Sequence, residues 1–299
     1  MKVTGFSFIR NGLKFDYPFV EAIRSVLPLC DDFVLAVGKS EDDTLKIAAQ
    51  IDPKIKIIET VWDETLRTGG RVLADETNKA FQAIGQDADW CIYIQGDEAL
   101  HQQDFDTIRR EMKAHLDNPK IEGFLLNYLH FYGSYDYVAE STAWYRREIR
   151  IVRNNKNIFS FRDAQGFRMT PDRKLNVRHI DACVHHYGWV REPAALRGKQ
   201  KACDTIFHGD KVEAKMEDIV VSVADEFDYS QIDALRRFEG THPAAIAPRI
   251  AAMNWKFDHD ISKNKLSLKD KFRFFMDKYF GFRPFEYKNY TIVSSYLND

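Results

Sequence analysis

Short apolar runs alternate with segments of helical periodicity through the first hundred residues. The runs at 3–9, 33–37, 55–58 and 90–94 are rich in β-branched and aromatic side chains, which is typical of buried strands. Between them, apolar residues recur at three- and four-residue spacing over 17–27 and 71–84, and a short helix is expected to end near residue 50. This alternation predicts a mostly parallel, doubly wound α/β sheet flanked by helices.

The alternation stops after residue 100. A helix is expected over 104–116, and strands are expected over 123–131, 148–152 and 182–189. No crossover helix separates the first two of these strands, so the sheet should become mixed. Residues 233–238 and 248–255 have helical patterns, and apolar residues from 272 to 279 line one face of an amphipathic helix. We expect one domain over 1–225 and a C-terminal helical extension over 226–299.

Composition narrows the function classes. The chain has 299 residues, 44% of them hydrophobic, and its formal net charge of −2 gives no drive toward nucleic acid. The four cysteines show no C-x-x-C spacing, which favours free thiols in a reducing cytoplasm over a metal–thiolate site. No apolar run reaches about 18 residues, so we expect neither a signal peptide nor a membrane span.

The run at 90–94 ends in Gln95-Gly96-Asp97-Glu98. Ligands of open α/β sheets bind at the carboxyl ends of such strands, and a glycine there lets a bulky group approach the backbone. Carboxylate oxygens at this place suit Mg²⁺ or Mn²⁺ carrying a phosphate. The alternative interpretation is a buried strand followed by a solvated acidic turn.

Two motifs in this order resemble family 2 glycosyltransferases. The turn Ser40-Glu41-Asp42-Asp43-Thr44 resembles that family's Ser-Thr-Asp-Gly-Thr turn after the second strand, and Gln95-Gly96-Asp97-Glu98 resembles its Asp-Ala-Asp-Glu metal motif. The resemblance covers roughly residues 1–195. It implies the GT-A fold, with a nucleotide-sugar half over about 1–100 and an acceptor half over about 101–225. It also implies inverting sugar transfer from a nucleotide-diphosphate sugar to a glycan or glycolipid, in cell-surface polysaccharide synthesis.

The metal motif departs from the family's pattern. Gln95 replaces the first acid, and an amide can hydrogen-bond to a ribose but cannot add charge to a cation. Only Asp97 is therefore carried over as a direct ligand of Mn²⁺ or Mg²⁺, and the metal is either bound more weakly or dispensable. The resemblance adds His186 as a second ligand. His185 and His186 point to opposite faces of a strand, so at most one of them faces the site.

Further roles follow from chemistry and from the resemblance together. Arg71 follows a glycine pair at a helix start and is expected near phosphate; the alternative is a solvated loop arginine. Asp163 lies where the family places its catalytic base, and the alternative is pairing with Arg162 or Arg168. Gly38 and Lys39 stand where the family often has an acid that contacts the nucleobase, so the sequence does not indicate which nucleobase the donor carries. Nucleotide-sugar contacts are expected from Arg10, Asn11, Ser40, Asp42, Arg71, Gln95 and Gly96.

An aromatic cluster follows the metal motif, and a basic segment ends the chain. His130, Tyr132 and Trp144 are candidates for acceptor binding, although core packing accounts for about half of the cluster. Basic residues outnumber acidic ones after residue 262. A basic amphipathic helix can lie on an anionic membrane, which would suit a lipid-linked acceptor; docking on the body of the protein or on a second subunit is the favoured alternative. The sequence does not indicate the oligomeric state.

Two other functions compete with sugar transfer. A nucleotidyltransferase would need a glycine-rich loop with a basic residue after the first strand, and Arg10-Asn11-Gly12 is sparse for that purpose. A non-catalytic nucleotide- or sugar-binding protein is favoured by Gln95. Incubation with a donor separates the two classes, because a binding protein releases no nucleoside diphosphate.

Overall fold

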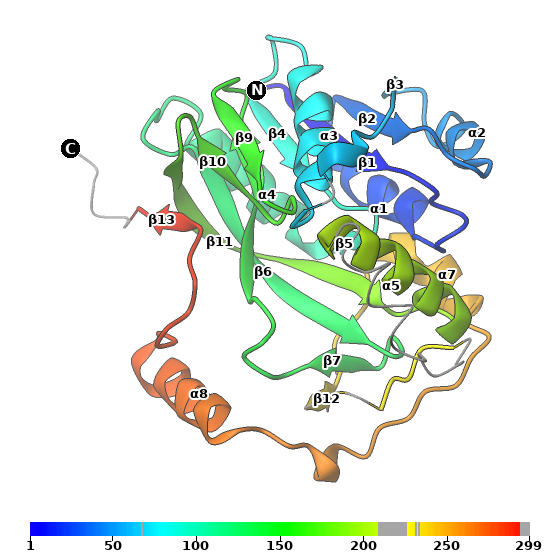
Figure 1. The fold of residues 1–299 in the computed structure, drawn as a ribbon. Helices are drawn as coiled ribbons and strands as arrows, with labels where there is room; N and C mark the ends of the chain where they lie inside the picture. The colour runs from blue at the N-terminus through cyan, green and yellow to red at the C-terminus, as the bar shows by residue number, and fades with distance from the viewer. Residues whose placement is uncertain (67, 209–225, 231, 233, 294–299) are drawn as a thin grey trace.

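A mixed α/β fold is built around one large sheet in the computed structural model, which describes residues 1–66, 68–208, 226–230, 232 and 234–293 (Figure 1). The strands are β1 (Val3–Ile9), β2 (Asp32–Gly38), β3 (Ile55–Thr60), β4 (Trp90–Tyr93), β5 (Glu98–Leu100), β6 (Gly123–Tyr132), β7 (Tyr137–Ala139), β8 (Arg147–Arg153), β9 (Ile158–Phe161), β10 (Gly166–Met169), β11 (Arg173–Trp189), β12 (Leu235–Arg237) and β13 (Tyr290–Ile292). The helices are α1 (Phe19–Val26), α2 (Thr44–Ala48), α3 (Arg71–Gln82), α4 (Phe105–Ala114), α5 (Pro193–His208), α7 (Ala247–Ala251) and α8 (Leu268–Phe280).

The order of the strands confirms the predicted fold class. Along its main path the sheet runs β3-β2-β1-β4-β8-β6-β11-β10-β9. The first four strands are parallel, and β8 then pairs antiparallel with both β4 and β6. The sheet is therefore doubly wound in its first half and mixed in its second, with helices on both faces.

Each face of the sheet has its own apolar core. Alternate residues of β1, β2 and β4 point to opposite faces, so Phe33 and Trp90 join one core while Phe6 and Tyr93 join the other. The first core is covered by α1 and α4, and the second is covered by α3 and the β9–β10 hairpin. The apolar spacing of these helices thus finds a complementary sheet face in each case.

The path of the chain creates a switch point between β1 and β4. From β1 the chain moves outward through β2 to β3, and it returns through α3 to β4 on the other side of β1. The order in which strands are added to the sheet therefore reverses between β1 and β4. Ligands of open α/β sheets bind at the carboxyl ends of the strands at such a point.

Several sequence predictions differ from the structure. The predicted helix at 233–238 is wrong over its described part, because Leu235–Arg237 is strand β12, which pairs with β7. The strand expected over 182–189 is the end of a longer strand, β11, which begins at Arg173; the alternation at Leu175 and Val177 was overlooked. Helix α5 was missed altogether. The proposed boundary at residue 225 lies outside the described residues.

The C-terminal segment contains the predicted amphipathic helix α8, shown at the lower left in Figure 1. A capping box begins it: the Ser267 side chain accepts from the Asp270 backbone, and the Asp270 carboxylate accepts from the Ser267 backbone. Gly281 ends the helix in the left-handed conformation, at φ 71°. In the described part of the chain, no helix is both long and apolar enough to cross a bilayer.

Candidate functional site

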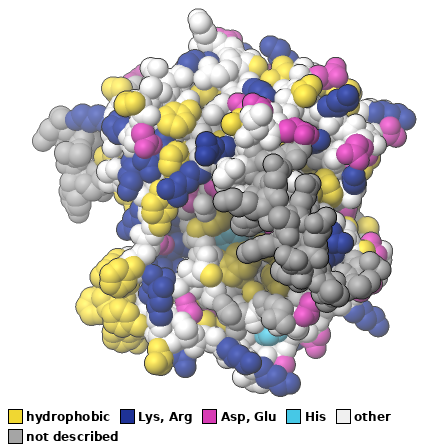
Figure 2. Space-filling view, viewed as in Figure 1, with side chains coloured by type: hydrophobic (Ala, Val, Ile, Leu, Met, Phe, Trp, Pro, Cys, Tyr) yellow, Lys and Arg dark blue, Asp and Glu magenta, His cyan; other side chains and the backbone are white. Residues whose placement is uncertain are grey.

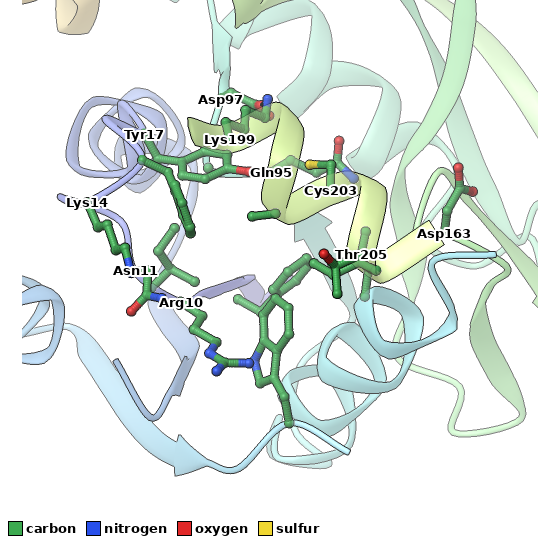
Figure 3. A pocket seen from close by; sticks show the side chains of 18 of the residues that line it. Arg10, Asn11, Lys14, Tyr17, Gln95, Asp97, Asp163, Lys199, Cys203 and Thr205 are labelled. Carbon is green, nitrogen blue, oxygen red and sulfur yellow. The ribbon is translucent and has the colours of Figure 1, made fainter. Parts of the chain in front are cut away.

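A cavity of about 440 Å³ lies at the switch point (Figure 3). Its lining combines the end of β1, the turn after β4, the β9–β10 hairpin, the end of β11 and one side of α5. Seven of the residues predicted from the sequence border it: Arg10, Asn11, Gln95, Gly96, Asp97, Asp163 and His186. The sheet topology thus brings together residues that are far apart in the sequence.

The loops after β1 and β2 are held together by side-chain hydrogen bonds. Asn11 adopts a left-handed backbone conformation, at φ 52°, and its carboxamide oxygen accepts from the backbone of Glu41 at 2.8 Å. Its own backbone N–H donates to Ser40 Oγ at 3.0 Å. The Asp42 carboxylate accepts from the backbone of Lys14 at 2.7 Å and of Thr44 at 3.0 Å. Ser40 and Asp42 therefore shape the loops and do not line the cavity, and their nucleotide role stays a prediction.

An aromatic corner forms beside Arg10. Its guanidinium lies 5.2 Å from the centre of the Trp62 ring, and the ring of Phe8 lies 6.0 Å from that of Trp62. All three residues line the cavity. A flat aromatic face next to a cation is a surface on which a planar, electron-rich group can stack.

Glu98 is locked into the protein interior. Arg150 binds both of its carboxylate oxygens, at 2.9 and 2.7 Å, and the Tyr128 hydroxyl donates to it at 2.8 Å. The backbone N–H of Gln95 donates to the same carboxylate at 3.1 Å. Glu98 is fully buried, so this network fixes the turn after β4 and leaves Glu98 no access to the cavity.

Asp97 points the other way, toward the cavity and a group of basic side chains. Lys199 Nζ lies 2.9 Å from its Oδ2, an Arg191 nitrogen lies 3.5 Å from the same oxygen, and His186 Nε2 lies 3.8 Å from Oδ1. Burial alone would raise the pKa of Asp97, but the Lys199 ammonium and the Arg191 guanidinium hold it well below its usual range. Asp97 is therefore a carboxylate at neutral pH.

The hydrogen-bond chain behind His186 assigns its tautomer. His130 Nε2 lies 2.7 Å from the backbone carbonyl of Tyr145, which can only accept, so this nitrogen carries the proton. His130 Nδ1 is then an acceptor, and His186 Nδ1 donates to it at 3.0 Å. The lone pair of His186 Nε2 consequently faces the Asp97 carboxylate. Burial lowers the pKa of His186 to about 4 and that of His130 to about 3, so both rings are neutral at pH 7.

Gly188 is required for this arrangement. The pairing of β11 with β6 shifts register between His186 and Trp189, which places Gly188 in a β-bulge. A Cβ atom on Gly188 would lie 2.5 Å from His186 Nε2 and 3.2 Å from an Asp97 oxygen. His185 points to the opposite face, where its ring stacks on Phe131, and it does not line the cavity.

Asp163 reaches the cavity from the β9–β10 turn. The residues on either side of it, Arg162 and Ala164, both have left-handed backbone conformations, at φ 56° and 63°. This tight turn presses the Asp163 side chain against Gly70, at whose position a Cβ would lie 2.8 Å from Asp163 Cβ. Figure 3 shows Asp163 on the opposite side of the cavity from Asn11 and Lys14. Its role as a base stays a prediction.

The N-terminal end of α3 is capped by α5. The backbone N–H of Gly69 donates to the carbonyl of Phe207 at 3.0 Å, and that of Gly70 donates to Ile206 at 3.4 Å. Arg71 begins α3 as predicted, but it is exposed and does not border the cavity. Its phosphate-binding role stays a prediction.

The predicted acceptor residues pack behind the cavity. His130 and Tyr132 are both buried and do not line it. The half-buried ring of Trp144 lies 5.1 Å from His130 and 6.4 Å from Tyr132. Their contacts match the core-packing interpretation, and acceptor binding by these residues stays a prediction.

The described side chains fit a divalent cation poorly. Asp97 and the lone pair of His186 converge, but no group of three or more His, Cys, Asp or Glu residues in the described ranges could hold a metal ion. The Gln95 amide nitrogen donates to the carbonyl of Ala164 at 3.2 Å. Two cationic side chains already contact the Asp97 carboxylate, and a metal ion there would be repelled by both.

Sequence reasoning missed four residues of this site. Lys199 and Arg191 pair with Asp97, and Tyr17 and Trp62 line the cavity. Two signals were available. Trp62 and Arg191 each follow the carboxyl end of a strand, where ligands of such sheets bind. Proline is favoured in the first turn of a helix, so Pro193 indicated the start of α5. Nothing local in the sequence could pair Lys199 with a carboxylate 102 positions away.

No family model and no curated protein matches this sequence. The crystal structure of S. aureus TarS is similar over 69% of this chain and 39% of that chain, with a TM-score of 0.40 and 12% identity. S. aureus TarS 1-349 in complex with UDP is similar over 69% of this chain and 65% of that chain, with a TM-score of 0.37 and 12% identity.

A third similar structure is glucosyl-3-phosphoglycerate synthase from Mycobacterium tuberculosis in complex with Mn²⁺, UDP and phosphoglyceric acid. It matches 43% of this chain and 43% of that chain, with a TM-score of 0.29 and 14% identity. The chain described here spans about two fifths of the length of the first of these structures.

Proposed function

We propose that this protein is an inverting glycosyltransferase that moves a sugar from a nucleotide-diphosphate sugar to a hydroxyl of a glycan or glycolipid. The observation that carries the proposal is the convergence of seven sequence-predicted residues, from Arg10 to His186, on one cavity at the switch point of the sheet. Its volume of about 440 Å³ lies in the range of roughly 300–1,000 Å³ that small-molecule sites occupy.

The lining has distinct regions that suit the parts of such a donor. The rings of Phe8 and Trp62, with the Arg10 guanidinium, form a face on which a nucleobase can stack. The basic side chains around Asp97 favour the diphosphate. Asp163 stands on another wall, where an acceptor hydroxyl can approach the sugar.

The proposed reaction uses these regions in one displacement. The acceptor oxygen forms a bond to the anomeric carbon while the bond from that carbon to the diphosphate oxygen breaks. The leaving oxygen keeps the electron pair, and the acceptor proton passes to the Asp163 carboxylate. Attack from the side opposite the leaving group inverts the anomeric configuration. The family resemblance implies that Asp97 and His186 would hold a divalent cation on the diphosphate, but the described side chains fit one poorly, because Lys199 and Arg191 already contact Asp97.

Replacing the base tests the proposal. For Asp163→Asn we expect kcat to fall by about 10²- to 10⁴-fold, the usual contribution of a positioned base, with nucleotide affinity unchanged. Asp172→Asn, in the exposed turn before β11, is the matched control and should keep full activity. The measurement is release of nucleoside diphosphate from candidate donors, with the anomeric configuration of the product read by NMR.

The same assay separates the competing functions. A nucleotidyltransferase would release pyrophosphate, and a binding protein would bind nucleotide without releasing any product. Full activity of Asp163→Asn would contradict the assigned base, and retention of the anomeric configuration would contradict the inverting mechanism.

We propose further that α8 and residues 281–288 rest on an anionic membrane that presents the acceptor. Leu268, Phe272 and Phe285 are 85%, 53% and 90% exposed, and Figure 2 shows a hydrophobic patch where α8 lies in Figure 1. The acids of this segment turn inward: Asp270 hydrogen-bonds to Thr142, and Asp277 and Glu286 pair with Arg146. Exposed lysines therefore dominate the outside of the segment, at positions 263, 265, 269, 271, 278 and 288.

Vesicle sedimentation tests this contact. We expect binding to vesicles of phosphatidylglycerol and phosphatidylcholine, little binding to phosphatidylcholine alone, and a loss of at least about tenfold in Phe272→Ser/Phe285→Ser. Both side chains are largely exposed, so the variant should fold. Equal binding of wild type and variant, or no vesicle binding by the wild type, would contradict the contact.

A further inference from the structure

Lys199 occupies the place where a cation is needed. Its ammonium lies 2.9 Å from Asp97 Oδ2 and 3.1 Å from the backbone carbonyl of Gly188. These are two hard oxygen acceptors, the kind of ligand that Mg²⁺ and Mn²⁺ prefer. Figure 3 shows Lys199 beside Asp97, reaching from α5 at the wall of the cavity. An ammonium has three N–H donors, so after these two bonds one remains available to the cavity.

Arg191 stands behind Lys199 as a second cation. Its guanidinium donates to the carbonyl of Gly188 at 2.7 Å and approaches Asp97 Oδ2 at 3.5 Å. Arg191 is completely buried, and the ring of Tyr17 covers it at 4.4 Å. The same ring lies 5.0 Å from the Lys199 ammonium. Two fixed cations thus face one carboxylate, which leaves one positive charge in excess at this wall.

The neighbouring histidine offers a further acceptor. His186 donates through Nδ1 to His130, and its Nε2 lies 3.8 Å from Asp97 Oδ1. The wall therefore offers a carboxylate, a carbonyl and an imidazole nitrogen as acceptors, and the Lys199 ammonium donates to the first two of them.

We propose that Lys199, supported by Arg191, is the cation that neutralises the diphosphate of the bound nucleotide, in place of a divalent metal ion. This inference rests on the proposed nucleotide-sugar function. When the bond from the anomeric carbon to the diphosphate breaks, negative charge grows on the leaving oxygen, and the remaining N–H of Lys199 stabilises it. Asp97 positions the ammonium and does not itself contact the phosphate.

The charge requirement supports this assignment. A nucleoside diphosphate is a multiply charged anion, and a site that binds it in a partly buried cavity must supply positive charge there. Asp97 alone would repel it. The two positive charges of Lys199 and Arg191 outweigh the charge of Asp97 and make the net charge of this wall positive. Both side chains are held in place by the protein itself.

The test compares nucleotide binding with and without metal. UDP, GDP, CDP and dTDP are titrated by calorimetry into the full chain, in EDTA and in MnCl₂. We expect at least one nucleotide to bind wild type in EDTA, with an affinity within about twofold of that in Mn²⁺. Binding of wild type only in Mn²⁺, or an increase of tenfold or more on adding Mn²⁺, overturns the inference while leaving the proposed function standing.

Lys199→Met sharpens the comparison. Removing the ammonium should weaken binding in EDTA by at least tenfold, and Mn²⁺ should restore part of it because Asp97 and His186 are then free to take a metal. Lys199→Arg keeps the charge and should retain most of the binding in EDTA. Lys201→Met, at an exposed position on the same helix, is the matched control and should bind as wild type does.

The remaining outcomes are equally decisive. Undiminished binding of Lys199→Met in EDTA overturns the inference. If Lys199→Met does not fold, the wild-type comparison in EDTA and Mn²⁺ still decides it. Absence of binding to any nucleotide in either condition refutes the proposed function and this inference together.

Discussion

Two adjacent carboxylates, Asp97 and Glu98, show how one turn serves two purposes. Both are buried and both contact an arginine, but the Glu98 contacts are short and complete, with Arg150 on both oxygens. Asp97 has one short contact, to Lys199 at 2.9 Å, and a longer one, to Arg191 at 3.5 Å, and it borders a cavity. The Glu98 network holds the turn in place, whereas the Asp97 cluster keeps a cation in reach of a ligand. Neighbouring residues of the same charge can therefore differ completely in role.

Breaking the Glu98 network should cause the largest loss of folding stability. Glu98→Gln leaves the buried Arg150 without its counter-charge, so we expect a loss of about 3–5 kcal/mol in the free energy of unfolding. Urea denaturation measures this loss. Glu59→Gln, exposed on β3, is the control and should change stability by less than about 0.5 kcal/mol. A loss in Glu98→Gln as small as that of the control would show that the network does not fix the fold.

Breaking the contacts of Asp97 should cause a smaller loss of folding stability. Asp97→Asn removes a charge-assisted bond at the edge of a cavity that water can reach, so we expect a loss of about 1–3 kcal/mol at pH 7. The pKa of Asp97 is lowered in the folded state, so its stabilisation is complete above the unfolded value near 3.9 and is lost as the pH falls below it.

The pH dependence distinguishes this contribution from a packing effect. Unfolding free energies of wild type and Asp97→Asn, measured from pH 7 to pH 3, should differ by a constant amount down to about pH 4 and converge below it. The lowered pKa values of His186 and His130 destabilise both proteins as the pH falls below about 6.5, so this effect largely cancels in the difference. A difference that is independent of pH throughout would contradict the assigned charge on Asp97.

The first half of the fold could be predicted because its pattern is local. Strand β1 has the predicted bounds and α3 begins at the predicted residue, since apolar periodicity alone determines which face of each element is buried. The turn after β4 was also predictable, because Gly96 and Asp97 follow shortly after a buried strand and must therefore lie at the edge of the sheet.

Other parts depended on contacts that no local pattern contains. Helix α5 was missed because Lys199, which pairs with a distant carboxylate, stands on its inward side between Leu196 and Cys203 and interrupts the apolar spacing. The Ser40 and Asp42 side chains form hydrogen bonds within their own loops. A sequence motif cannot show whether a polar group binds a ligand or its neighbours. Strand β12 has only three residues and exists through its pairing with β7.

The end of α5 contacts the start of α3, and the same helix positions the Lys199 ammonium. The last carbonyls of α5 accept from the two glycine amides before α3, and the same helix carries Lys199. One helix therefore fixes two parts of the cavity wall at once, and a displacement of α5 would shift the ammonium and uncover both amide groups together.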